Sequence, residues 1–159
     1  MTSLAGPVWV DTHCHLDDPA FDDSREQLLA DAAGAGVERV INVGYRPERW
    51  ETTLALAASS PMVAYSLGIH PGHADEFSPE TCDALSRLCH ENHPSAIGEI
   101  GMDFYWDGPS AALQQDALRA QLRLARDLGI PAIIHQRAAE AEILAVFESE
   151  QTLPALVLH

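Results

Sequence analysis

Short apolar runs alternate with longer amphipathic segments along the whole of this sequence. Six runs have the composition of β-strands: Val8–Thr12, Arg39–Val43, Val63–Leu67, Ala96–Glu99, Ala132–His135 and Ala155–His159. They are apolar or β-branched throughout rather than alternating, which is typical of strands that are buried on both faces. Strands of this kind predict a parallel sheet, because the crossover helices of a parallel sheet cover its faces.

The segments between these runs have the apolar period and the end signals of helices. They are Asp23–Ala35, Pro47–Ser59, Ser78–Glu91, Ser110–Leu128 and Ala138–Glu150. Ser78, Pro79 and Glu80 form a helix start with a capping serine, a proline in the first turn and an acidic residue. Ser110–Leu128 has the clearest apolar stripe, formed by Leu113, Ala117, Leu124, Ala125 and Leu128, and Gly129 ends it.

A run of βα units spaced at about the 30 residues of a βαβ motif favours a TIM-type barrel. We predict one α/β domain over residues 1–159, an incomplete (β/α)8 barrel with about six βα units and parallel strands. A doubly wound sheet is the alternative, but no Gly-rich dinucleotide fingerprint follows the first strand. A complete barrel takes about 250 residues, so two βα units are missing and the first and sixth strands are expected to be open edges. Such edges favour self-association.

Composition limits the partners of the chain. The 159 residues have a formal net charge of −15, and all nine basic residues are arginines. Such a chain repels nucleic acid at long range, so any attraction to a phosphodiester must come from bound metal ions and a few local arginines. The sequence contains neither a membrane-spanning apolar stretch nor a signal peptide, which predicts a cytoplasmic protein. Its three cysteines do not suggest a disulfide framework.

The most specific local motif is Asp11-Thr-His-Cys-His15, at the end of the first apolar run. Side chains alternate faces along a strand, so Asp11, His13 and His15 share one face and the two imidazoles converge like metal ligands. Cys14 points to the opposite face, and we interpret it as a packing residue. Isolated histidines are usually surface or satisfied core residues, so the site depends on what other strands contribute.

Polar residues end three further predicted strands. Glu99 ends the fourth, His135 the fifth and His159 the sixth. Barrel enzymes gather their chemistry at the carboxyl ends of the strands, so these residues should meet His13 and His15. Four histidines and one carboxylate suit a two-metal hydrolytic site in which Glu99 bridges the ions. A terminal histidine is the weakest member of this set.

The remaining histidines and cysteines have simpler interpretations. His90 and His93 lie at a polar helix end, where they act as C-terminal charges. Cys82 and Cys89 are expected to face the core from a helix.

Together these residues resemble one family, the TatD-related metal-dependent deoxyribonucleases of the amidohydrolase superfamily. The resemblance covers essentially the whole chain in order and spacing. It rests on Val10-Asp-Thr-His-Cys-His-Leu-Asp17, Leu67-Gly-Ile-His-Pro71, Ala96-Ile-Gly-Glu-Ile-Gly-Met-Asp-Phe-Tyr105, Gln121-Leu-Arg-Leu-Ala125, Ile130-Pro-Ala-Ile-Ile-His135 with Arg137, and Leu156-Val-Leu-His159.

The resemblance implies roles for individual residues. His13 and His15 would hold the first metal with Glu99 as shared carboxylate, and His135 and His159 would complete the second site. His70 and Asp103 match positions near the substrate, and Arg137 is a candidate phosphate contact. The structural alternatives are a turn or helix-capping aspartate for Asp103 and a structural ion pair for Arg137.

The activity implied is hydrolysis of DNA phosphodiester bonds, as a 3'-5' exonuclease, with two divalent ions. Zn fits the imidazole-rich set, and Mg or Mn suits carboxylate and water ligands. A late aspartate that completes the first metal site in this family has no counterpart in these 159 residues. Two other hypotheses stay open: another amidohydrolase chemistry on amides, lactones or small phosphoesters, or a non-catalytic remnant that binds metal or a partner.

Overall fold

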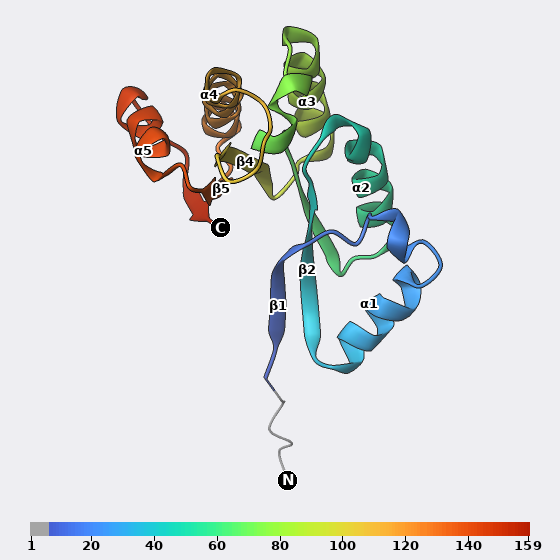
Figure 1. Cartoon of the computed structure of the whole chain (residues 1–159). Helices are drawn as coiled ribbons and strands as arrows, with labels where there is room; N and C mark the ends of the chain where they lie inside the picture. The colour runs from blue at the N-terminus through green and yellow to red at the C-terminus, as the bar shows by residue number, and fades with distance from the viewer. Residues whose placement is uncertain (1–6) are drawn as a thin grey trace.

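The fold is a single curled parallel sheet with helices along its outer side (Figure 1). The computed structural model describes residues 7–159, and over these residues the sheet has six strands in the order β1-β2-β3-β4-β5-β6. Every neighbouring pair is parallel. The strands are β1 (Trp9–Cys14), β2 (Val37–Gly44), β3 (Val63–Leu67), β4 (Ala96–Asp103), β5 (Ala132–Arg137) and β6 (Leu156–Leu158). This confirms the predicted incomplete TIM-type barrel and excludes the doubly wound order.

Helices connect successive strands, as parallel crossovers require. The α-helices are α1 (Arg25–Gly34), α2 (Pro47–Ser59), α3 (Pro79–Asn92), α4 (Ala111–Leu128) and α5 (Glu140–Ser149). Two 3-10 helices, η1 (Pro19–Phe21) and η2 (Pro71–Glu76), lie in the connections after β1 and β3. Among the residues described, no helix is long and apolar enough to cross a membrane.

The helix ends follow the sequence signals closely. The Ser78 side chain accepts from the Thr81 amide, and the Thr81 side chain accepts from the Ser78 amide, which completes a capping box at α3. Ser110 caps α4 with a single hydrogen bond, accepting from the Leu113 amide. Gly129 ends α4 in the left-handed conformation (φ 69°), which glycine adopts without a steric penalty.

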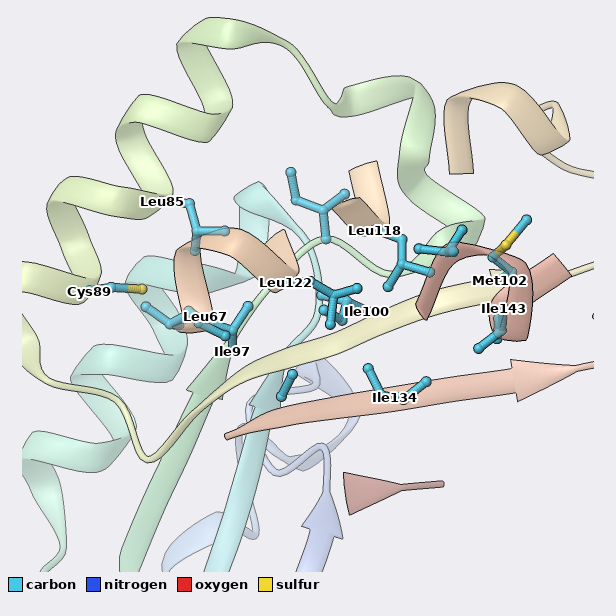
Figure 2. Close-up of a cluster of buried hydrophobic side chains, with 14 of the residues drawn as sticks. Leu67, Leu85, Cys89, Ile97, Ile100, Met102, Leu118, Leu122, Ile134 and Ile143 are labelled. Carbon is cyan, nitrogen blue, oxygen red and sulfur yellow. The ribbon is translucent and has the colours of Figure 1, made fainter. Parts of the chain in front are cut away.

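The main core lies between the sheet and the helices that cover β3, β4 and β5 (Figure 2). Its central side chains come from β3, β4, β5, α3 and α4 and are almost completely buried: Leu67, Leu85, Ile97, Ile100, Leu118, Leu122 and Ile134. The predicted burial on both faces is confirmed for β4, whose eight residues are all buried, whereas β2, β3 and β5 are buried only in part.

The two edge strands differ from that expectation. Trp9 and Val10 of β1 are 57% and 55% exposed, and Leu158 of β6 is 72% exposed. Neither strand has a second neighbour within the described sheet, so the side chains at the two edges remain open to solvent. Leu113 also departs from the sequence analysis, since it is 41% exposed on α4 instead of belonging to the buried stripe.

The fourth strand is longer than the sequence analysis predicted. β4 continues through the glycine-containing segment to Asp103, so Glu99 lies in the middle of the strand and Asp103 ends it. The pairing register with β5 is irregular between Ile97 and Ile100, around Glu99. Glycine at 101 is required, because a Cβ there would lie 1.9 Å from the His135 carbonyl oxygen. The close approach of β4 and β5 brings Glu99 next to His135.

Candidate metal centre

One buried carboxylate joins the predicted ligands. Glu99 is 4% exposed, and its Oε1 lies 2.9 Å from His135 Nδ1 and 2.9 Å from His159 Nδ1. Its other oxygen, Oε2, lies 3.3 Å from His13 Nε2. The two carboxylate oxygens therefore face different histidines, which is the arrangement that a bridging carboxylate needs.

The first histidine pair comes from β1 and the residue beyond it. The His13 and His15 rings meet edge to face, with centroids 5.1 Å apart. His15 Nδ1 lies 3.3 Å from the Val43 carbonyl oxygen on β2, which leaves Nε2 available for a ligand. Asp11 accepts a hydrogen bond from the His13 amide instead of joining the cluster. Ligand atoms of His13, His15 and Glu99 lie within 4.8 Å of one another, so these three could hold one cation.

The second group is built around His135 on β5. Besides its contact with Glu99, His135 has Nε2 2.9 Å from Asp103 Oδ2. Because one carboxylate faces each ring nitrogen, Asp103 fixes the ring orientation while Nδ1 points toward the shared carboxylate. Asp103 also accepts from the amides of Tyr105 and Trp106. The turn role and the site role of Asp103 are both present in the structure.

Charge and burial act on these groups in opposite directions. Burial would raise the pKa of Glu99, but hydrogen bonds from His13 and His135 outweigh it and hold that pKa well below its usual range. Burial would lower the pKa of His135, but the Glu99 and Asp103 carboxylates raise it above the ordinary value. The cluster therefore stabilises an ionised carboxylate and attracts positive charge.

His70 follows β3 and lies beside His135, with ring centroids 4.4 Å apart. Its Nδ1 accepts a hydrogen bond from the Gly72 amide at 3.0 Å. Burial, together with the charge of His135, lowers the pKa of His70 to about 4. His70 is therefore neutral at neutral pH, and its proton sits on Nε2, because Nδ1 is an acceptor. Although the ligand atoms of His70, Glu99 and His135 lie within 4.8 Å of one another, this tautomer makes His70 a hydrogen-bond donor.

Two buried glutamines on α4 hold the segments that carry His70 and Asp103. Gln121 accepts from the Ile69 amide at 2.7 Å and donates to the Ile69 carbonyl at 3.1 Å. Gln114 accepts from the Asp103 amide at 2.8 Å and donates to the Asp103 carbonyl at 3.0 Å. Neither glutamine has a role that the sequence predicts. The available signal was two polar residues, seven apart, on the buried face of an amphipathic helix.

A further polar network surrounds Asp17, two residues after His15. Asp17 is 1% exposed and accepts from Arg49 Nε at 3.2 Å and from Thr53 Oγ1 at 3.1 Å. Asn42 accepts from the Asp17 amide at 3.2 Å. This network fixes the chain just after His15 to β2 and α2. The sequence does not predict this network, because no local pattern pairs Asp17 with residues on α2.

The site opens into a cavity of about 360 Å³. His15, His70, His73 and Glu99 line it together with Tyr45, a residue that the sequence analysis did not select. The Tyr45 ring meets the His15 ring edge to face, with centroids 5.1 Å apart. The Glu99 carboxylate is therefore reached from this cavity.

Arg137 is the one predicted site residue that lies outside this cluster. Its guanidinium carbon stands over the Tyr105 ring, 3.9 Å from the centroid. Over the part of the chain that the structure describes, Arg137 makes no ion pair, so the alternative of a structural ion pair is wrong there.

The three cysteines and the two histidines at the end of α3 lie outside the cluster. Cys14 donates to the Ile41 carbonyl and packs into a small core, and burial raises its thiol pKa to about 11. Cys89 is buried in the main core, where burial raises its pKa to about 12. Cys82 is only partly buried. His90 and His93 lie at the end of α3, as predicted.

Comparison with known proteins identifies the family. The family model described as "TatD related DNase" matches residues 10–159. The chain belongs to this family. An uncharacterized metal-dependent hydrolase, YjjV of Escherichia coli, is 36% identical to this TatD-family chain over 149 residues, which are 92% of the chain and 57% of YjjV. The 3'-5' ssDNA/RNA exonuclease TatD of Cronobacter sakazakii is 33% identical over 150 residues, or 94% of the chain and 57% of that protein.

Solved structures of TatD relatives have the same fold. The crystal structure of E. coli YjjV superimposes with a TM-score of 0.82 at 33% identity, over 88% of this chain and 55% of YjjV. A TatD-family hydrolase from Entamoeba histolytica gives a TM-score of 0.82 at 19% identity, over 89% of this chain and 54% of that protein, and supports the fold alone. The chain thus spans little more than half the length of the relatives it matches.

Proposed function

We propose that this chain carries the metal centre of a hydrolase that cleaves phosphodiester bonds of DNA, acting as a 3'-5' exonuclease with two divalent cations. The observation that carries the proposal is the contact of one buried carboxylate, Glu99, with His13 through one oxygen and with His135 and His159 through the other. Membership of a family of metal-dependent hydrolases and the names of the exonuclease relatives support this chemistry.

The donor set fits divalent cations. His13, His15 and Glu99 would hold one ion, and Glu99, His135 and His159 would hold the other. Four imidazoles with one carboxylate favour Zn, while Mn is also compatible and Mg fits less well, because it prefers oxygen ligands. In such two-metal sites the cations supply Lewis-acid polarisation of the phosphoryl group and a lower pKa for bound water.

Residues of the chain itself supply the remaining functions. His70 is neutral and carries its proton on Nε2, so it can donate a hydrogen bond to a phosphate oxygen without changing its charge. Asp103 holds the His135 ring in the orientation that directs Nδ1 to the shared carboxylate. Gln114 holds the backbone of Asp103, and Gln121 holds the backbone of Ile69 next to His70, through hydrogen bonds.

A direct test is an exonuclease assay on the purified 159-residue chain, supplied separately with Zn, Mn and Mg. The substrate is single-stranded DNA labelled at its 5' end, because digestion from the 3' end then gives a ladder of shortening labelled products. We expect metal-dependent digestion that a chelator stops. Glu99→Gln should abolish it, since the carboxamide cannot serve both cations.

Glu91→Gln is the matched control, because Glu91 is exposed near the end of α3 and belongs to neither ligand group. This variant should retain full activity. Loss of activity in Glu99→Gln but not in this control excludes a contaminating nuclease. Cleavage by Glu99→Gln at the same rate as by the control would contradict the proposal. So would an absence of cleavage with every cation by a folded, metal-loaded chain.

A further inference from the structure

An exposed aromatic pair follows directly after β4. Tyr105 and Trp106 are 59% and 65% exposed, and their rings meet edge to face with centroids 4.8 Å apart. The Arg137 guanidinium carbon lies 3.9 Å from the Tyr105 ring centroid and 5.3 Å from the Trp106 ring centroid. The two aromatic rings are exposed to solvent, contact the Arg137 guanidinium and do not belong to the hydrophobic core. Such a group suits the π-face of a flat ligand.

The aromatic pair is tied to the candidate metal centre. Asp103 Oδ1 accepts from the Tyr105 amide at 2.9 Å and from the Trp106 amide at 3.3 Å, while its other oxygen contacts His135. One carboxylate therefore sets both the His135 ring and the backbone that presents the two aromatic residues. A ligand on this surface would have a defined position relative to the metal centre.

A second cavity, of about 190 Å³, is lined both by one residue of the aromatic pair and by residues next to the metal centre. Trp106 forms one side of it, and His70 and Asp103 form part of the rest. Asp107 also lines this cavity, so two carboxylates face it. A phosphate group would be repelled there, whereas a neutral ring with N–H donors would be accepted.

The positive charge of Arg137, beside this surface, favours a nucleic acid strand over an uncharged flat ligand. The chain has a net charge of −15, and most of its arginines are paired with carboxylates. Arg137 forms no ion pair within the described residues, so its charge is available to a flanking phosphate. An aromatic face next to a free cation is how proteins bind single strands without reading their sequence.

We propose that Tyr105, Trp106 and Arg137 form a base-stacking platform for a single-stranded nucleic acid. A nucleobase stacks on Trp106 at the mouth of the second cavity, and Arg137, supported by Tyr105, contacts a neighbouring phosphate. The inference rests on the proposed function for the identity of the strand. The platform itself binds bases with or without cations, and it admits only unpaired strands, because a stacked base must be unpaired.

The test uses fluorescence of the chain, because Trp106 is itself the reporter. Trp50 is 4% exposed, so Trp9, which is 57% exposed, is the one other solvent-accessible tryptophan among the described residues, and Trp9→Phe removes it. This variant is titrated, in a chelator that prevents cleavage, with a thymidine pentanucleotide and with an abasic pentanucleotide of equal charge. We expect the thymidine strand to quench Trp106 and to bind more tightly than the abasic strand.

Trp106→Ala should weaken binding of the thymidine strand by about 5- to 150-fold, measured by anisotropy of a labelled oligonucleotide, and leave the abasic strand unchanged. Trp106→Phe should restore most of the affinity, because phenylalanine also stacks. The Trp106 side chain is mostly in solvent, so its removal should not disturb folding, and circular dichroism checks this. Equal losses for both strands, or no loss for either, would overturn the platform.

The outcome is separable from that of the proposed function. Base-dependent quenching of Trp106 in a chain that cuts no DNA with any cation would retain the platform and reject the nuclease activity. Cleavage at the same KM for wild type and for Trp106→Ala would retain the activity and reject the platform.

Discussion

The imidazole rings of His13 and His159 lie stacked, with centroids 3.9 Å apart and planes within 6° of parallel. His13 lies in β1 and His159 lies just beyond β6, so they belong to opposite ends of the strand order. No strand pairing joins these two edges within the described sheet. The sheet is curled, and both histidines contact Glu99, so the two edges meet at the site although no pairing of the described strands joins them.

This geometry predicts that the metal content of the chain depends on Glu99. Purified wild-type chain should carry about two equivalents of divalent cation by elemental mass spectrometry, because the carboxylate is shared between two ligand groups. Glu99→Gln should lose both equivalents together. His15→Ala should lose only one, since His15 belongs to the first group. Retention of two equivalents by Glu99→Gln would show that the carboxylate bridges nothing.

Cation binding should also depend on pH in a predictable direction. The carboxylates of Glu99 and Asp103 raise the pKa of His135, and a cation must displace that proton. As the pH falls through this raised pKa, apparent affinity should fall by about tenfold per pH unit for one displaced proton. His70, with its pKa lowered to about 4, is already neutral across this interval and adds nothing.

Competition with a chromogenic chelator at a series of pH values measures this dependence. Asp103→Asn is the informative variant, because it removes one of the two carboxylates that raise the pKa of His135 and should move the loss of affinity to lower pH. An affinity that is independent of pH over the titration range of His135 would contradict its role as a ligand.

The sequence was sufficient for the fold and for the convergence of the candidate ligands. Parallel strands bring their carboxyl ends to one edge, so residues near the ends of β1, β4, β5 and β6 had to converge. The length of β4 was not predictable, because Gly98 and Gly101 weaken a strand signal. The structure retains them in the strand because the main chain of β5 passes too close for a side chain.

The supporting contacts required the structure. Asp17 meets Arg49 across 32 residues, and Gln121 meets Ile69 across 52, so no local pattern reveals either pair. The same holds for Arg137, at the end of β5, and Tyr105, in the loop after β4. Local patterns identify the groups that carry the chemistry, and the packing of distant segments determines what orients them.

Gln121→Leu should destabilise the chain and displace His70. The substitution leaves the Ile69 amide and carbonyl unsatisfied in a buried setting, which costs about 1–3 kcal/mol for each group. Urea denaturation measures the loss, and the NMR shifts of the His70 ring report its displacement. Gln115→Leu is the control, since this other glutamine of α4 is only partly buried. Equal stability of the two variants would exclude the anchoring role of Gln121.

The open edges of the sheet lead to a prediction about association. The edge strands present exposed apolar side chains beside unpaired backbone groups, with Val10 at 55% and Val157 at 49% exposure. Edges of this kind pair readily with other chains, so we expect sedimentation velocity to detect concentration-dependent self-association. Val10→Lys together with Val157→Lys should shift the chain toward monomer, because pairing of the edges would bury the lysines. Thr52→Lys, on the exposed face of α2, is the control and should leave the degree of association unchanged. A wild-type chain that sediments as a monomer at every concentration would contradict this expectation, because some contact other than strand pairing would then protect both edges.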